Sequence, residues 1–186
     1  MKEQILEPIL RYLRKRRVLP IIKQFKNCTV LDVGCGWEAR LLKDVEPYIS
    51  KGIGLDFKAP EINTSKIQTI KCTLCDKLPF EDNSFDVVTM LAVLEHLNEP
   101  QKMVNEVFRV LKKDGIFCGT VPSIWSKPVL EFLSYKLNIV NPDEIRDHKD
   151  YYTKGKLQTL FKNALFGEFY HSYFQLYMNN FFKVKK

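Results

Sequence analysis

A glycine-rich turn and an acidic residue twenty positions after it are the strongest chemical signal in this chain. Gly34 and Gly36 follow a short apolar run at residues 28–33, and Asp56 closes a second one. Glycines directly after a buried strand let backbone N–H groups approach a ligand closely. A carboxylate at the end of the next strand can accept both hydroxyls of a ribose. The pair predicts a site for a nucleoside-containing cofactor, whereas the fingerprint Gly34-x-Gly36-x-x-Ala39 alone is a weak signal.

Two histidines are candidates for a general base, since the pKa of imidazole is near neutral. His96 follows the fourth apolar run, and His148 lies in a polar segment near the C-terminus. Each has a structural alternative. Glu95 and His96 can instead tie a strand end to the next helix, and His148 can either line an acceptor pocket with Tyr151 and Tyr152 or fasten the loop.

The five cysteines do not form a metal-binding pattern. Cys72 and Cys75 make a lone CxxC, whereas a structural zinc site normally needs a second pair at matching spacing. The other three are scattered singly, at Cys28, Cys35 and Cys118. We therefore expect reduced thiols and no metal.

Short apolar runs alternate with segments of helical periodicity along the chain. Strands are predicted at residues 28–33, 52–56, 66–71, 85–90 and 116–121. Helices are predicted at 38–49, from a cap at Asn98 to a stop near Gly115, at 125–137 and at 154–164. This alternation is typical of an α/β fold with a parallel sheet and helices on both faces. Ligands of such sheets bind beyond the carboxyl ends of the strands, where the candidate residues fall.

The chain ends in a predicted hairpin with strands at 169–177 and 181–184 and a turn at Asn179 and Asn180. The last 38 residues hold eleven of the 23 aromatic residues. Aromatic residues interleaved with lysines can stack on the bases of single-stranded RNA. Strand propensity favours the simpler interpretation, in which they pack the hairpin into the sheet.

Length and composition predict one ordinary globular domain over residues 1–186, with a basic helical segment at 1–26 and a core at 27–186. The 45% hydrophobic and 27% charged fractions exclude a disordered chain. No run reaches the roughly 20 apolar residues of a spanning helix, and Glu3, Glu7 and Pro8 interrupt what a signal peptide would need. We expect a cytoplasmic protein.

The net charge of +7 is concentrated at the two ends of the chain. Residues 1–26 carry eight Lys/Arg and two Glu, and residues 149–186 carry seven basic and two acidic residues. The middle, 27–148, has fourteen basic and eighteen acidic residues. The N-terminal segment is therefore either a helix packed on the domain with a solvated basic end, which we favour, or a surface for an acidic acceptor, partner or membrane.

Several segments, in order, resemble the class I S-adenosylmethionine (SAM)-dependent methyltransferases, specifically their small-molecule, methyltransferase type 11-like branch. They are VLDVGCG (30–36), GIGLD (52–56), LPFEDNSFDVVTMLAVLEHL (78–97), NEVFRVLKKDGIF (105–117) and HKDYYTKGKLQTLFKNALF (148–166). The resemblance implies a Rossmann-like seven-stranded sheet of order 3-2-1-4-5-7-6 with strand 7 antiparallel. The terminal hairpin would supply strands 6 and 7.

The resemblance also implies a set of cofactor-binding residues. Around the methionine part of SAM it places Asp32, Gly34, Cys35 and Gly36. It gives Asp56 the ribose and Phe57 the adenine, and it sets Leu91 and Ala92 beside the methionine end or the reacting sulfonium.

Three features depart from the family pattern. Glu38 stands where the family usually has a third glycine, and we expect it in the first turn of a helix. Leu74 stands where an Asp often accepts from the adenine amino group, so that contact falls to the backbone, Thr73 or Asp76. The segment between Asp56 and the third strand is short, which leaves the adenine edge more open.

The favoured function is methyl transfer from SAM to an O, N or C atom of a small molecule. An RNA or protein methyltransferase that uses the basic termini is the first alternative, although the segment after strand four has neither an Asn/Asp-Pro-Pro-aromatic motif nor a Pro-Cys nucleophile. A non-catalytic SAM-binding partner subunit is the second. A nicotinamide oxidoreductase is disfavoured by Asp32 before the glycine turn and by the lack of a second domain. The residues specify neither the acceptor nor an oligomeric state.

Overall fold

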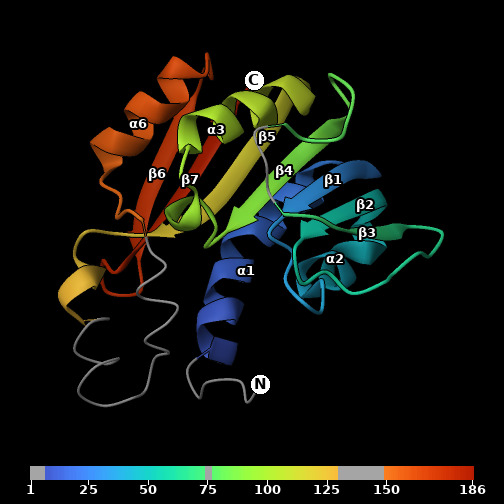
Figure 1. Ribbon diagram of the computed structural model, residues 1–186, viewed down its shortest axis with the longest axis horizontal. Coiled ribbons are helices and arrows are strands. Elements are labelled where there is room, and N and C mark those ends of the chain that lie inside the picture. Colours follow the sequence, from blue (N-terminus) through green and yellow to red (C-terminus); the bar gives the residue numbers. More distant parts are fainter. Residues whose placement is uncertain (1–6, 74–76, 130–148) are drawn as a thin grey trace.

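Seven strands form one mixed sheet in the computed structural model, which describes residues 7–73, 77–129 and 149–186 (Figure 1). The strands are β1 (Cys28–Val33), β2 (Ile49–Asp56), β3 (Ile67–Lys71), β4 (Phe85–Leu91), β5 (Leu111–Pro122), β6 (Phe169–Phe174) and β7 (Asn179–Lys185). Their order across the sheet is β3-β2-β1-β4-β5-β7-β6. All neighbouring pairs from β3 to β5 are parallel, and β7 is antiparallel to β5 and β6. The predicted fold class and strand order are confirmed.

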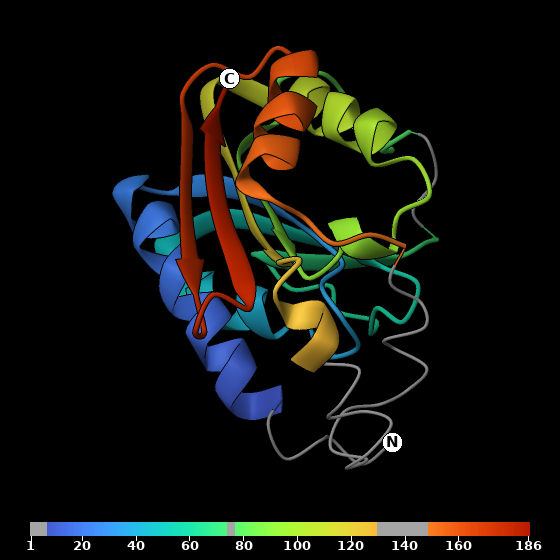
Figure 2. The ribbon, with the colours of Figure 1, turned by 90° about the vertical axis from the view of Figure 1, so that its left-hand side faces the viewer.

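Helices cover both faces of the sheet, and each face has its own hydrophobic core (Figures 1 and 2). On one face lie α1 (Glu7–Gln24), α2 (Arg40–Val45) and the short 3-10 helix η1 (Glu46–Tyr48). On the other lie α3 (Pro100–Val110) and α6 (Lys154–Asn163), and the 3-10 helix η2 (Leu94–His96) follows β4. Apolar residues at helical spacing, such as Met103, Val104, Val107 and Val110 of α3, build the second core.

Helix α1 lies in the predicted N-terminal helical segment. Pro20 lies inside the helix, which continues to Gln24. Val18, Ile21 and Ile22 pack on the sheet, whereas Ile9 is 58% exposed. The apolar residues near the start of the helix therefore do not all serve to fix it to the domain.

Two local predictions were wrong. Helix α3 begins at Pro100 after Glu99, so Asn98 is not its cap, and its last residue is Val110 because β5 starts at once with Leu111. The β6–β7 turn lies at residues 175–178, where Gln175, Leu176 and Tyr177 have positive φ angles. Asn179 and Asn180 belong to β7. The amide of Asn180 is buried and donates to the carbonyl oxygens of Val121 and Tyr152, and these partners favour the strand.

The remaining boundaries agree with the prediction to within a few residues, with three exceptions: β2 starts three residues early, β5 starts five residues early at Leu111, and α2 is short. The predicted helix at 125–137 is described only for a helical turn at 126–129, because residues 130–148 lie outside the described structure. Within the described ranges, no helix has both the length and the apolar character needed to cross a membrane.

Candidate functional site

The turn after β1 depends on glycine at two positions. Gly34 and Gly36 have φ angles of +79° and +70°, a region that side-chain-bearing residues rarely adopt. A Cβ atom on Gly34 would lie 2.2 Å from Cγ2 of Val93, so the turn packs directly against the segment after β4. A Cβ on Gly36 would meet no heavy atom within 4 Å. Open space therefore lies over the second glycine, as a bound ligand requires.

Asp56, at the end of β2, connects the turn after β1 with the turn after β2. One of its carboxylate oxygens accepts a hydrogen bond from Gly36 N at 2.9 Å, and the other accepts from Lys58 N at 2.7 Å. Each oxygen can accept further bonds, because a carboxylate has about four acceptor positions. The half-buried carboxylate is thereby held in place beside the glycine turn.

Asp32 lies beneath the turn rather than at its surface. It is 3% exposed, and its carboxylate accepts a hydrogen bond from the Thr89 hydroxyl at 2.6 Å. Burial raises the pKa of the Asp32 carboxyl to about 6, even though the Thr89 bond favours the ionised form. Thr89 was not predicted as a site residue. Only the pairing of the strands reveals it, because Thr89 lies opposite Asp32 in the register of β1 and β4.

The neighbouring Cys35 is not a nucleophile in this arrangement. Burial, together with the charges of Asp32 and Asp56, raises the pKa of its thiol to about 12. A thiol that stays protonated at neutral pH is unreactive. Its backbone N–H donates to the Leu55 carbonyl at 3.1 Å, and that of Gly34 donates to the same oxygen at 2.7 Å. Cys35 therefore shapes the turn, which is compatible with the predicted place beside the cofactor.

The segment after β4 lies against the glycine turn. Leu91 is half-buried at the end of the strand, and Ala92 has a φ of 57° with its N–H donating to the Thr120 carbonyl at 2.9 Å. Val93 then contacts Gly34. The structure thus brings Leu91 and Ala92 to the same edge as Gly34 and Gly36, as predicted. Val93, which fixes that approach, was not anticipated.

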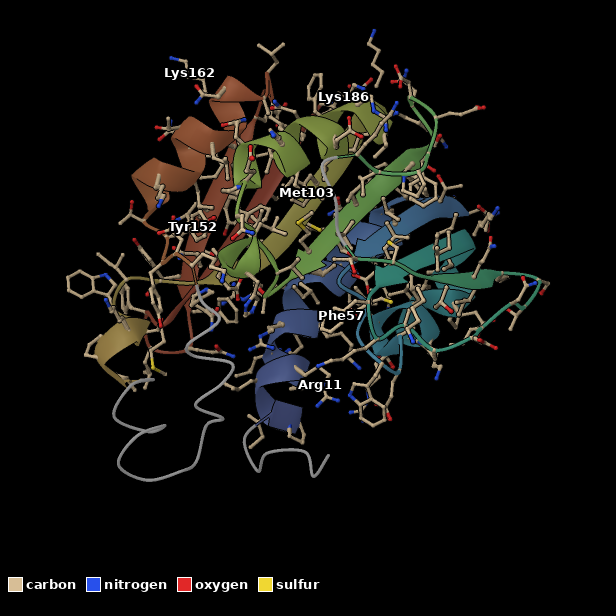
Figure 3. All side chains as sticks on the ribbon, in the orientation of Figure 1. Arg11, Phe57, Met103, Tyr152, Lys162 and Lys186 are labelled. Atoms are coloured by element: carbon tan, nitrogen blue, oxygen red, sulfur yellow. The ribbon has the colours of Figure 1, made fainter. Side chains whose placement is uncertain are left out.

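Residues expected near the adenine follow β2 and β3. The Phe57 side chain is 57% exposed, with the Lys58 ammonium 4.8 Å from its ring centroid. Figure 3 shows Phe57 toward the same end of the molecule as Arg11 of α1. Thr73 is exposed just beyond β3, and Cys72 N donates to the Asp56 carbonyl at 3.0 Å. Leu74, like Cys75 and Asp76, lies outside the described residues.

Glu95 and His96 occupy η2, directly beyond β4, and differ sharply in exposure. His96 is half-buried, whereas Glu95 is 1% exposed. Burial raises the pKa of the Glu95 carboxyl to about 8, against the lowering effects of its own backbone N–H and of the Arg14 charge. Within the described residues, its Oε2 atom has no hydrogen-bond partner. Burial therefore favours the protonated, uncharged form of Glu95.

The C-terminal loop returns to this region. Lys149 N donates to the Glu95 carbonyl at 2.7 Å, so the chain just after His148 runs beside η2. His148 itself lies outside the described residues. Tyr152 is 1% exposed, and its hydroxyl donates to the Leu94 carbonyl at 3.3 Å. Of the two alternatives for Tyr152, the structure supports the fastening role (Figure 3).

Glu38 does not lie in the first turn of a helix, because α2 begins at Arg40 after Ala39 adopts a left-handed φ of 48°. Its carboxylate forms an ion pair with Arg40, whose guanidinium lies 5.9 Å from the Trp37 ring centroid. The predicted position of Glu38 in the first turn of a helix is therefore wrong, and Arg40 counters its charge.

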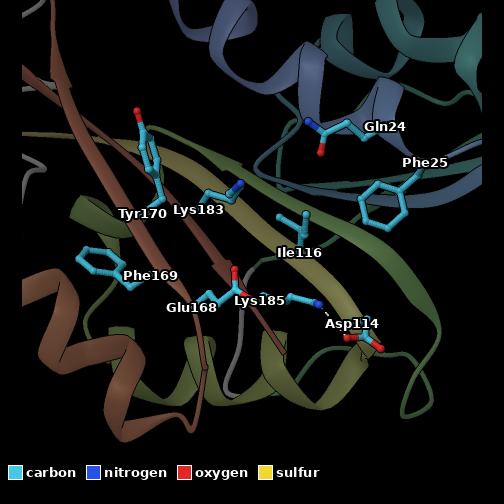
Figure 4. A pocket seen from close by; sticks show the side chains of 9 residues that line it. All are labelled: Gln24, Phe25, Asp114, Ile116, Glu168, Phe169, Tyr170, Lys183 and Lys185. Atoms are coloured by element: carbon cyan, nitrogen blue, oxygen red, sulfur yellow. Dashed lines mark ion pairs between the residues drawn. The ribbon is translucent and has the colours of Figure 1, made fainter.

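Two further observations limit where ligands can bind. In the described part of the chain, no group of three or more His, Cys, Asp or Glu side chains could hold a metal ion. A cavity of about 480 Å³ lies at the amino end of β5, where Lys185 pairs with Asp114 at 2.8 Å (Figure 4). That cavity is at the amino end of the parallel strands, whereas Gly36 and Asp56 are at their carboxyl end, so it is not part of this site.

The chain is similar to known methyltransferases in sequence. The sequence profile of the family described as "Methyltransferase domain" matches residues 31–119. The uncharacterized methyltransferase YcgJ of Bacillus subtilis is 30% identical over 128 residues, covering 63% of this chain and 50% of the relative. The demethylmenaquinone methyltransferase of Lactiplantibacillus plantarum is 31% identical over 111 residues, covering 53% and 46%. The chain spans about half the length of these curated relatives.

A solved structure has the same fold over nearly the whole chain. The SAM-dependent methyltransferase from Archaeoglobus fulgidus superposes with a TM-score of 0.71 at 17% identity, covering 97% of this chain and 94% of that one. The sequence match spans the β1 turn, Asp56 and the β4 segment, which are the parts that build the site. Residues 31–119 therefore match a methyltransferase domain, and the fold of the chain is that of solved SAM-dependent methyltransferases.

Proposed function

We propose that this chain transfers the methyl group of SAM to an O, N or C atom of a small molecule. One observation supports this most directly: the Asp56 carboxylate is held beside the open space over Gly36 by two backbone N–H groups. A nucleoside with free ribose hydroxyls fits this pairing of acceptor and cradle. When bound, SAM supplies a methyl group already activated on a sulfonium.

The residues of the chain would bind SAM and orient it toward the acceptor, rather than activate the methyl group. Asp56 would accept the ribose hydroxyls, Phe57 would cover the adenine, and Thr73 would lie at the adenine edge. Gly34, Cys35 and Gly36 would line the methionine part, with Asp32 beneath them contributing a buried carboxyl. Leu91 and Ala92 would border the space where the acceptor approaches. Displacement at an activated methyl group depends mainly on such alignment.

A base is needed only when the acceptor must lose a proton. His96, half-buried beyond β4, is the described residue that we propose for this role, and His148 is a second candidate. Glu95 does not compete for it, because a carboxyl that is 1% exposed does not reach an acceptor without rearrangement.

The relatives support an acceptor of low molecular weight. The Lactiplantibacillus plantarum relative is named for demethylmenaquinone. A Caenorhabditis elegans relative, 31% identical over 102 residues, is named sterol 4-C-methyltransferase. Both names denote small organic acceptors.

The experiment that tests the proposal is incubation with methyl-labelled SAM and fractionated cell extract. Label in low-molecular-weight products is the expected result. Label in RNA or protein would support the first alternative instead. Tight SAM binding without transfer to any fraction would assign the chain to the non-catalytic subunits.

A further inference from the structure

Large hydrophobic side chains are exposed at the carboxyl end of the sheet, in addition to Trp37 and Phe57 in the turns after β1 and β2. Leu176 is 90% exposed, and Trp125 is 61% exposed. We define six such residues as the apolar rim: Ile9 and Tyr12 of α1, Ile124 and Trp125 after β5, and Leu176 and Tyr177 between β6 and β7. Exposed apolar groups that gather on one side of a protein mark an interaction surface.

The three segments that carry the rim are joined to one another. Gln175 Nε2 donates to the Leu10 carbonyl at 3.5 Å, which ties the β6–β7 turn to α1. Ser123 N donates to the Met178 carbonyl at 3.0 Å, and Trp125 N donates to the Ser123 hydroxyl at 3.2 Å. Figures 1 and 2 show α1 running past the strands on this side. The segments that carry the rim residues are therefore tied to one another at the same end of the sheet.

Two arginines of α1 stand beside aromatic rings near the rim. Of the other cations of this helix, Lys15 pairs with Asp44 at 2.8 Å, and Lys23 lies in the last turn, 4.3 Å from the Tyr48 ring centroid. The Arg16 guanidinium lies 5.8 Å from the Tyr12 ring centroid, and that of Arg17 lies 5.3 Å from the Phe174 ring centroid. A long cationic side chain can keep its charge at a polar surface while its stem enters an apolar layer. The Tyr12 ring is exposed and can enter with it, whereas Phe174 is buried in the core and only holds Arg17 in place.

We propose that the carboxyl end of the sheet docks on the surface of an anionic lipid bilayer. Arg16 and Arg17 of α1 would face the anionic headgroups, and the apolar rim would insert at the boundary between headgroups and acyl chains. Trp and Tyr rings favour that depth because they have an apolar body and a polar atom. Docking would hold the opening of the candidate site at the level of the headgroups.

The composition of the rim favours lipid over nucleic acid. Single-stranded RNA is bound by aromatic platforms on which bases stack. Half of the rim residues, Ile9, Ile124 and Leu176, are aliphatic and provide no stacking surface. Aliphatic side chains leave water favourably only in an apolar layer, which a bilayer provides.

The test is binding of the purified full-length chain to vesicles of phosphatidylcholine, alone or mixed with phosphatidylglycerol, followed by co-sedimentation. Binding to the anionic vesicles that weakens with salt is expected. In a Trp37→Phe background, Trp125 fluorescence should shift to shorter wavelength on binding. Vesicle binding does not require methyl transfer, so this inference and the proposed function can fail separately.

Matched variants make the test specific. Trp125→Ser combined with Leu176→Ser should abolish vesicle binding. Leu165→Ser should not change it, because Leu165 is 77% exposed but lies before β6, at the opposite end of that strand from Leu176. Arg16→Glu with Arg17→Glu should lower the vesicle partition coefficient about tenfold or more. Lys162→Glu at the far end of the molecule should have little effect (Figure 3). Unchanged circular dichroism would show that the variants fold.

Three outcomes would overturn the proposal. One is that the parent and the Trp125/Leu176 variant bind equally well, each with the same affinity for neutral and for anionic vesicles. A second is absence of vesicle binding together with binding of poly-uridylate that the Arg16/Arg17 variant loses, which would make the surface an RNA site. The third is a dimer in sedimentation that Leu176→Ser dissociates, which would assign the rim to self-association.

Discussion

Asp56 accepts a hydrogen bond from Gly36 N at 2.9 Å, so the acid that ends β2 also fixes the glycine turn that follows β1. The two residues are the strongest signal in the sequence, and the fold turns their twenty-residue spacing into direct contact. Loss of the carboxylate should therefore affect both the proposed ribose contact and the shape of the turn.

Replacement of Asp56 by Ala should weaken SAM binding by about 100-fold or more, because hydrogen bonds to a charged group contribute about 1.5–3 kcal/mol each. Isothermal titration calorimetry measures the effect. Asp114→Ala is the matched control, since Asp114 lies at the opposite end of the sheet and pairs with Lys185. Equal SAM affinity of both variants would remove Asp56 from the site.

The two glycines of the turn should respond differently to alanine. Gly34→Ala places a Cβ 2.2 Å from Val93 at a positive φ, so it should lower the free energy of unfolding by about 1–3 kcal/mol. Gly36→Ala meets no atom and should be milder for stability, but it should reduce SAM affinity by filling the cradle. Denaturant unfolding and calorimetry separate the two effects.

The control for the glycine pair is Gly155→Ala in α6, where a Cβ also meets nothing within 4 Å and φ is not positive. It should be neutral or slightly stabilising, because alanine has the higher helix propensity. A Gly34→Ala variant as stable as this control would contradict the close packing against Val93.

Glu95→Gln should stabilise the protein at alkaline pH. The pKa of this carboxyl rises from 4.5 to about 8 on folding, so the folded state binds more protons than the unfolded state between these values. Stability is then full below about pH 4.5 and is lost as the pH rises toward 8. Gln carries no charge, so its Tm should exceed that of the parent by about 4–8 °C at pH 9, with little difference at pH 5.

Thermal melts across this pH range test the Glu95 prediction. Glu99→Gln, at an exposed residue before α3, is the control and should follow the parent curve. A Glu95→Gln variant less stable than the parent at pH 9 would show that the ionised carboxylate is stabilising there.

His96→Gln should lower kcat by about 100-fold or more if the acceptor loses a proton to this imidazole, while SAM affinity stays unchanged. His171→Gln is the control, because His171 lies in β6 and contacts Asn180 Oδ1 at 2.8 Å away from the site. Initial rates with the acceptor found in the labelling experiment provide the readout. An unchanged kcat would leave His96 with a structural role.

Much of the fold could be predicted from the sequence because apolar strands and ordered motifs specify it locally. The β6–β7 turn was misplaced because Gln175, Leu176 and Tyr177 adopt positive φ angles without the glycine that usually announces them. Asn180 resembles a turn residue, yet its buried amide is satisfied by Val121 and Tyr152, which are distant in sequence.

The candidate site shows the same division. Gly34, Gly36 and Asp56 could be found because their chemistry depends on residue type and spacing. The contact of Val93 with Gly34 and the burial of Glu95 could not, since both depend on how the chain after β4 folds back on its neighbours. Local sequence carries no signal for such packing.

The decisive measurement is titration of SAM into the parent protein by isothermal calorimetry. Saturable binding is expected, and Asp56→Ala should weaken it strongly whereas Asp114→Ala should not. Absence of any binding of SAM or of S-adenosylhomocysteine at millimolar concentration would contradict it.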